Sequence, residues 1–326
     1  MKRFKNILCV VDIRQADTPS LQRAVKLAEN NQASLTVVDA AERISAGIKM
    51  PGGGPISADL QTATMDHHRQ KLESIVNPYR KHIEIQARVL QGIPFLEIIR
   101  EVLRNGHDLL IKAPETLDWL DRFFSSDDMH LLRKCPCPVW LVKPEAPETY
   151  QRILAAVDVD DACPPTELEV RHSLNREILE LAISLSLSEF TELHVVHVWE
   201  AIGEGAMRGT LMHTPEEKII SYVEQVRQQH SNNLSALIKD VTASMNQDVL
   251  EYVKPRIHLI KGRARKEIPA LSARIKADLL VMGTVARTGV PGFLIGNTAE
   301  TILSQIDCSV LAIKPPGFQT PVTLED

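Results

Sequence analysis

The sequence has few aromatic residues and no strongly basic balance. Aromatic residues make up 4% of the 326 residues, and the formal net charge is −5. A platform for single-stranded nucleic acid needs exposed rings on which bases stack, and a duplex needs a basic surface for its phosphates. The composition therefore argues against nucleic acid as a partner.

Long apolar runs and a cysteine framework are also missing. No run reaches the roughly 18 apolar residues that a membrane-spanning helix requires. The apolar run Ile7–Val11 is too short for a signal peptide and ends at Asp12. The five cysteines fit neither a disulfide framework nor the ligand spacing of a zinc site. We therefore expect a cytoplasmic protein with reduced thiols, no metal site and no membrane span.

Sequence motifs of the common enzyme classes are absent as well. The chain has no Gly-Lys-Ser/Thr of a Walker A loop, no Gly-x-Gly-x-x-Gly and no Gly-x-Ser-x-Gly. No carboxylate pair has a spacing that indicates acid–base catalysis. These absences favour a binding protein over an enzyme.

The two halves of the chain instead resemble each other. Ile7-Leu8-Cys9-Val10-Val11-Asp12 opens the first half, and Ile153-Leu154-Ala155-Ala156-Val157-Asp158 opens the second. Near the end of each half, segment 108–113 corresponds to 278–283 and segment 137–144 to 308–315. We infer two copies of one domain, at residues 1–147 and 148–326. The segment between them is short and polar, which predicts that the copies pack directly.

Each copy alternates short apolar segments with longer amphipathic ones. This pattern predicts an α/β fold of two tandem Rossmann-like domains, each a five-stranded parallel sheet with helices on both faces. The strands expected in the first copy are Asn6–Asp12, Ser34–Val38, Ile83–Leu90, Asp108–Ile111 and Val139–Lys143. Those expected in the second are Arg152–Val159, Glu192–Val198, Arg256–Ile260, Asp278–Met282 and Val310–Lys314. Helices are expected in the second copy at about 174–187, 215–245, 266–276 and 297–305.

The second copy is longer than the first in one region, at about 202–245. Glycines at 203, 205 and 209 follow its second strand, as the glycines at 52–54 do in the first copy. Loops at the carboxyl ends of parallel strands bind ligands in sheets of this kind. A connector without a ligand is the other interpretation of this loop.

A candidate phosphate site follows the fourth strand of the second copy. Gly283 comes directly after the strand and Gly296 directly before a predicted helix, so a ligand could approach bare backbone and unpaired N–H groups. Arg287 could add a charge-assisted hydrogen bond. The alternative is structural, because Asn297 and Glu300 have the spacing of a capping box. The basic run 261–266 also has two interpretations. It could face an anionic ligand, or it could be the solvated start of a helix.

Four segments resemble a known family. They are Gly283-Thr284-Val285-Ala286-Arg287-Thr288-Gly289, Gly296-Asn297-Thr298-Ala299-Glu300, His130-Leu131-Leu132-Arg133-Lys134-Cys135-Pro136 and Gln319-Thr320-Pro321-Val322. Across both halves the chain resembles the universal stress protein family in its tandem form, of the E type. The nucleotide-binding branch of that family has Gly-x2-Gly-x9-Gly-Ser/Thr after the fourth strand, and this loop grips the phosphates and ribose of ATP.

The resemblance implies a set of ligand-binding positions in the second copy. The first and third motif glycines fall on Gly283 and Gly296, whereas Ala286 and Asn297 stand at the second glycine and the Ser/Thr. The family's acidic residue near the ribose corresponds to Asp158, and its apolar adenine contact to Val198. The ligand-binding residues implied, with Arg287 added, are Asp158, Val198, Gly283, Ala286, Arg287, Gly296 and Asn297.

In the first copy, the matching motif positions hold Ala113, about Thr116, Ser125 and Ser126. Asp127 and Asp128 follow at the start of the next helix, where carboxylates repel a phosphate. We therefore expect that the first copy does not bind ATP in the family manner.

The function expected is that of a cytoplasmic, non-enzymatic stress-response protein whose second copy is a candidate site for ATP, with a role for Mg²⁺ left open. The family's usual homodimer would be imitated within one chain, and a further homodimer is left open. The alternative ligand is a larger or more apolar metabolite, which Ala286, Asn297 and the enlarged loop at 202–213 would accommodate. Weak ATP hydrolysis is a third hypothesis.

Overall fold

The computed structural model describes residues 3–14, 19–42, 55–115, 126–209, 212, 214–243, 245, 252–284 and 296–324. In the first copy the strands are β1 (Asn6–Val10), β2 (Ser34–Ala41), β3 (Ile85–Gln91), β4 (Leu109–Lys112) and β5 (Val139–Leu141). The helices are α1 (Pro19–Asn31), α2 (Pro55–Val76), the 3-10 helix η1 (Asn77–Lys81), α3 (Pro94–Asn105) and α4 (Ser126–Lys134).

The second copy repeats this order. Its strands are β6 (Arg152–Ala156), β7 (Glu192–Trp199), β8 (Arg256–Lys261), β9 (Leu279–Gly283) and β10 (Ser309–Ile313). Its helices are α5 (Pro165–Glu189), α6 (Glu204–Arg208), α7 (Glu216–Thr242), α9 (Ala264–Ile275) and α10 (Asn297–Leu303). The short helix α6 lies in the enlarged loop, and α5 begins nine residues before the expected start at Leu174.

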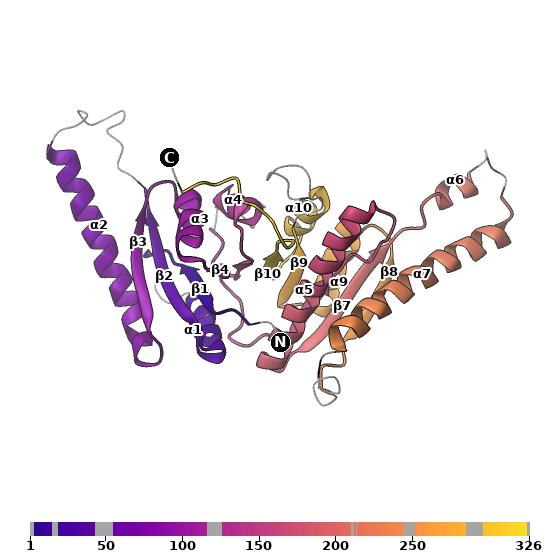
Figure 1. Ribbon diagram of the computed structural model, residues 1–326, viewed down its shortest axis with the longest axis horizontal. Coiled ribbons are helices and arrows are strands. Elements are labelled where there is room, and N and C mark those ends of the chain that lie inside the picture. Colours follow the sequence, from indigo (N-terminus) through magenta and orange to yellow (C-terminus); the bar gives the residue numbers. More distant parts are fainter. Residues whose placement is uncertain are drawn as a thin grey trace.

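The ten strands form one sheet in the order β3-β2-β1-β4-β5-β10-β9-β6-β7-β8. Pairing is parallel within each copy, as expected, because each strand returns to the sheet through a helix. The terminal strands β5 and β10, expected only to lie near each other, pair antiparallel with Leu311 opposite Trp140. The two five-stranded sheets are therefore halves of a single sheet (Figure 1).

Helices cover both faces of this sheet, and each face has its own apolar core. One core combines side chains from α1, α2, α5 and α7, and the other combines side chains from α3, α4, α9 and α10. Strand residues alternate between the two cores, since successive side chains of a strand point to opposite faces. In β6, for example, Ile153 and Ala155 belong to the first core and Leu154 and Ala156 to the second. Each core thus runs through both copies.

Charged contacts also join the copies. Arg23 of α1 forms an ion pair with Glu189 at the end of α5 and lies 3.6 Å from the ring centre of Tyr150. On the other face, Arg133 Nη2 lies 2.8 Å from Glu300 Oε1. These contacts confirm that the copies pack directly across the short polar segment.

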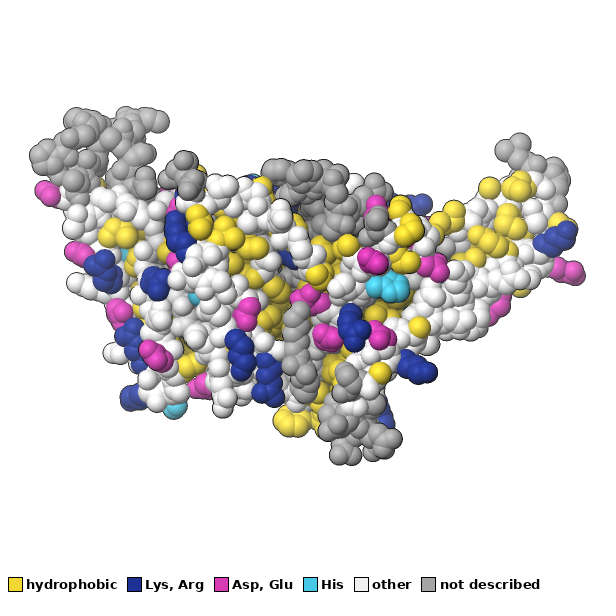
Figure 2. All heavy atoms as spheres, viewed as in Figure 1, with side chains coloured by type: hydrophobic (Ala, Val, Ile, Leu, Met, Phe, Trp, Pro, Cys, Tyr) yellow, Lys and Arg dark blue, Asp and Glu magenta, His cyan; other side chains and the backbone are white. Residues whose placement is uncertain are grey.

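Figure 1 shows α2 and α7 at opposite ends of the molecule, each covering the outer strands of its own copy. On the side shown in Figure 2, hydrophobic side chains gather over α6 and the start of α7. Ile202, Met212 and Ile220 are among the exposed hydrophobic residues there. Within the described ranges, no helix is long and apolar enough to cross a membrane.

Candidate functional site

A cavity of about 810 Å³ opens at the carboxyl ends of the inner strands of the second copy. Strands β6, β7 and β9 end at its floor, and the starts of α9 and α10 contribute to its walls. This edge is where parallel α/β sheets bind ligands. The cavity is within the range of small-molecule sites, which is about 300–1,000 Å³.

Five residues singled out from the sequence line this one cavity. They are Asp158, Val198, Gly283, Gly296 and Asn297. The two remaining candidates, Ala286 and Arg287, lie outside the described residues. The structure therefore brings together residues that are up to 139 positions apart in the sequence.

Gly283 is the last residue of β9, and its backbone forms part of the cavity floor. A Cβ atom built at this position would lie 2.7 Å from Cδ2 of Leu174, which is closer than such atoms approach in proteins. Leu174 belongs to α5 and lines the same cavity. A larger residue here would have to displace the end of the Leu174 side chain, so this glycine also contributes to the packing of β9 against α5.

The start of α10 corrects one expectation. Gly296, not Asn297, is the N-cap residue, and no side chain caps the helix. The Gly296 N–H donates to the carbonyl oxygen of Thr284 at 3.1 Å, and Glu300 pairs with Arg133 instead of closing a capping box. The capping-box interpretation is wrong because Asn297 already lies inside the helix. The Asn297 side chain is exposed at the cavity wall and does not cap the helix.

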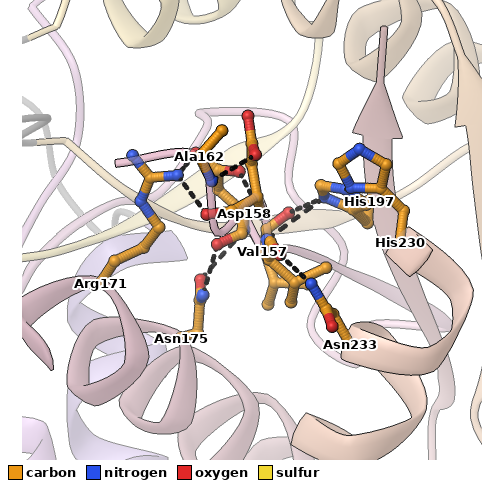
Figure 3. Close-up of polar contacts among 10 residues, drawn as sticks. Val157, Asp158, Ala162, Arg171, Asn175, His197, His230 and Asn233 are labelled. Carbon is orange, nitrogen blue, oxygen red and sulfur yellow. Dashed lines mark hydrogen bonds and ion pairs between the residues drawn. The ribbon is translucent and has the colours of Figure 1, made fainter. Parts of the chain in front are cut away.

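Asp158 lies in the loop after β6, and two residues of α5 hold this loop in place (Figure 3). The buried Asn175 side chain accepts a hydrogen bond from the Asp158 N–H at 3.0 Å and donates to the Asp158 carbonyl oxygen at 2.6 Å. Arg171 Nη1 donates to the carbonyl oxygen of Asp160 at 2.6 Å and lies 3.4 Å from Asp158 Oδ2. The Asp158 carboxylate, 62% exposed, is thereby fixed at the cavity edge.

A histidine on β7 supports the same loop from the other side. His197 Nδ1 lies 3.2 Å from the Val157 carbonyl oxygen and 3.4 Å from the Val159 nitrogen, the residues that flank Asp158. Its other ring nitrogen, Nε2, contacts Nδ1 of His230 on α7 at 3.0 Å. Burial lowers the pKa of His197 below its ordinary value, so its neutral form is favoured.

The basic run at 261–266 provides another part of the cavity wall. Gly262, Arg263 and Arg265 line the cavity at the start of α9. Arg263 Nε lies 4.0 Å from Glu200 Oε2, a loose ion pair in solvent. The structure thus places this run where it could face an anion, which the sequence had left open.

The chain is similar to known proteins over nearly its whole length. The family model described as the universal stress protein family matches residues 3–143 and again 149–314. The chain belongs to the universal stress protein family. Universal stress protein E of Escherichia coli K12 is 30% identical over 337 residues, which cover 100% of this chain and 99% of that protein. The universal stress protein E homolog of Haemophilus influenzae is 30% identical over 96% of this chain and 98% of its own length.

Solved structures agree with the fold. A structure from Pseudomonas aeruginosa UCBPP-PA14 is 25% identical, covers 96% of this chain and 94% of its own, and has a TM-score of 0.65. A universal stress protein from Archaeoglobus fulgidus has a TM-score of 0.61 over 95% of this chain and 98% of its own, at 15% identity. The tandem α/β architecture expected from the sequence is thereby confirmed.

The two universal stress protein copies differ at the floor of the cavity. Register in the sheet equates Lys112 of β4 with Met282 of β9, and the sequence equates Asp128 with Ala299. Lys112 Nζ donates to Asp128 Oδ1 at 2.7 Å, and the fully buried Asp128 also accepts the Glu115 N–H at 3.0 Å. An internal ion pair therefore stands in the first copy where the second copy has two small or apolar cavity-lining residues.

Sequence reasoning missed the residues that hold the Asp158 loop. One signal was present, because Ser173-Leu174-Asn175-Arg176 corresponds to Ser20-Leu21-Gln22-Arg23 in the first copy. A polar residue repeated at a helix position next to a core leucine indicates a structural contact. The partnership of His197 with His230 left no such signal, since the two residues are 33 positions apart on different elements.

Proposed function

We propose that the second copy of this universal stress protein binds an adenine nucleotide, with ATP as the candidate, and that the protein acts as a non-enzymatic regulator in the cytoplasm. The main support is the convergence of Asp158, Val198, Gly283, Gly296 and Asn297 on one cavity of suitable size. The family resemblance assigns the same positions to nucleotide contacts.

The residues present fit such a ligand. Bare backbone at Gly283 and Gly296 admits a close approach of phosphate, and the start of α9 with Arg263 and Arg265 adds positive charge nearby. Asp158 can accept hydrogen bonds from ribose hydroxyl groups. A bound nucleotide would occupy the cavity and bridge the starts of α9 and α10, so that its presence could be sensed at the surface.

The first copy supports the same proposal by contrast. Its Lys112–Asp128 pair fills the corresponding floor, and the Asp128 carboxylate would repel a phosphate. We therefore propose one nucleotide per chain.

Isothermal titration with ATP, with and without Mg²⁺, tests the proposal on the full chain. We expect saturable binding with one site, and loss of that binding in Gly283→Val, because the larger side chain enters the space of Leu174 and the cavity floor. Ala113→Val is the matched control, since Ala113 holds the equivalent position in the first copy. It should bind ATP like the unaltered protein. No heat change at millimolar ATP with folded protein would remove the proposal.

A second candidate is a larger or more apolar metabolite in the same cavity. Apolar side chains contribute a continuous part of the lining, and Ile202, with 74% of its surface exposed, stands at the enlarged loop. Native mass spectrometry of freshly purified protein separates the candidates through the mass of a co-purified molecule. Weak hydrolysis of ATP would appear in either case as phosphate release faster than the uncatalysed rate.

A further inference from the structure

The contact between β7 and α7 contains a pair of buried histidines. His197 is 1% exposed and His230 is 8% exposed, and their facing nitrogens, Nε2 and Nδ1, are 3.0 Å apart (Figure 3). Trp199, two residues along β7, stacks against His230 with ring centres 5.8 Å apart. The imidazole pair is therefore a buried polar contact between strand and helix, next to a tryptophan ring.

Such a pair tolerates only one proton between its facing nitrogens. In the neutral pair one nitrogen donates and the other accepts, which satisfies both. A single added proton can go to His197 Nδ1, which then donates to the Val157 carbonyl oxygen while Nε2 donates to His230. The hydrogen bond from the Val159 N–H to Nδ1 is then lost. When both rings are protonated, two N–H groups and two positive charges face each other in a buried site, and the contact becomes repulsive.

The same position in the first copy has the opposite chemistry. Sheet register equates His197 with Asp39, since Val196 and Val38 hold matching places beside Ala156 and Val10. Asp39 Oδ2 lies 2.5 Å from Nδ1 of His68 on α2, the helix that corresponds to α7. Protonation of His68 makes this contact an ion pair of opposite charges. Added protons therefore bring opposite charges together in the β2–α2 contact and like charges together in the β7–α7 contact.

The charged groups around the histidine pair are few. The loop after β6 contributes the acidic residues Asp158, Asp160 and Asp161, of which Asp161 accepts hydrogen bonds from Gln229 on α7. On β8, Lys261 Nζ lies 5.9 Å from the ring centre of Trp199, and Glu204 of α6 pairs with this lysine. Asp158 and Asp160 favour protonation of His197, but burial opposes it more strongly and lowers the pKa of His197.

The sign of the pH effect follows from this shift. A histidine whose pKa is lower in the folded state than in the unfolded state binds fewer protons when folded. Its stabilising contribution is complete above the ordinary histidine pKa and is lost as the pH falls below it. His194 and His258 form a second stacked pair on the other face of β7, with nitrogens 2.9 Å apart, and burial lowers the pKa of both. Both faces of β7 thus respond to acid in the same direction.

We propose that His197 and His230 form an acid-sensitive latch, which releases α7 and the Asp158 loop in the second copy while Asp39 and His68 keep α2 in place in the first. His197 couples the two events, because its Nδ1 contacts the residues on either side of Asp158. That opening would lower the affinity for a ligand of the cavity; this last consequence rests on the proposed function, whereas the latch itself does not.

Hydrogen–deuterium exchange of the nucleotide-free full chain at pH 7.5 and pH 5.5 tests the latch, with rates corrected for the intrinsic effect of pH. We expect the protection of α7 to fall at the lower pH, because the opened state binds more protons there than the closed state. Protection in the second half of α2 should not fall. Because no nucleotide is present, failure here and failure of ATP binding are separate results.

Two variants identify the histidine pair as the cause. His230→Gln keeps a hydrogen-bonding group opposite His197 but cannot bind a proton, and His197→Asp installs the pair found in the first copy. Both should retain α7 protection at pH 7.5, and neither should show the acid-induced fall. The proposal is overturned if α7 stays equally protected at both pH values, if His230→Gln shows the same fall as the unaltered protein, or if α2 opens in parallel with α7.

Discussion

At the scale of single residues, the two copies are distinguished by charge at equivalent positions. Lys112 and Asp128 stand where the second copy has Met282 and Ala299, and they form a buried ion pair. A buried pair of this kind is costly to break, because the remaining charge has no solvent to stabilise it. The first copy therefore has an internal ion pair at the positions that form the cavity floor in the second copy.

Breaking that pair should destabilise the protein more than replacing it. Lys112→Met leaves the Asp128 carboxylate buried and should lower the free energy of unfolding by about 3–5 kcal/mol. The double variant Lys112→Met, Asp128→Ala, which installs the residues of the second copy, should recover more than half of this loss. Urea unfolding of the three proteins measures the difference. If the free energy of unfolding of Lys112→Met lay within about 1 kcal/mol of that of the unaltered protein, the ion pair would not stabilise the first copy in this way.

The sequence indicated the residues that line the cavity better than the residues that hold the Asp158 loop in place. Gly283 could be predicted because it stands at the end of a near-continuous apolar strand, whereas Val198 was implied only by the family resemblance. Asn297 could not be assigned correctly, since the N-cap of a helix is decided by backbone angles within one turn, and Gly296 adopts them instead. The contact of His197 with His230 depends on how α7 lies on the sheet, which no local pattern contains.

At the scale of elements, β5 and β10 decide how the copies assemble. Both strands would be unprotected edges in an isolated copy. Their side chains are buried on both faces of the sheet. Unpaired edge strands are templates for pairing with another chain. In the full chain they satisfy each other through antiparallel pairing, with Val310 opposite Leu141.

An isolated copy should therefore associate with another chain. We expect residues 1–147 or 148–326, produced alone, to form dimers through β5 or β10, and the two halves produced together to form a 1:1 complex. Sedimentation velocity at micromolar concentration distinguishes these species. A half that remained a folded monomer would contradict the role given to the terminal strands.

Elements could be predicted where hydrophobic periodicity is strong. The ten expected strands agree with the structure to within three residues at each end, and the apolar runs of the inner strands are buried on both faces. The start of α5 was missed, since its first turns contain Glu167 and Glu169 and have no apolar stripe. Proline at position 165 was the available sign of that start, because proline fits the first turn of a helix.

At the scale of the whole molecule, one continuous sheet joins two copies that have diverged in opposite directions. The second copy has a cavity floored by glycine and apolar residues, a fixed Asp158 loop and a contact that acid weakens. The first has a filled floor and, at the matching helix–strand contact, a carboxylate facing a histidine. We infer that the first copy serves as a stable half on which the second can respond to a ligand.

A crystal structure of the full chain grown with millimolar ATP tests this asymmetry most directly. The account predicts one nucleotide per chain, lodged beside Gly283 and Gly296 with its ribose near Asp158, and the Lys112–Asp128 pair intact in the first copy. Nucleotide lodged against Ala113 and Ser126, with the cavity of the second copy empty, would contradict it.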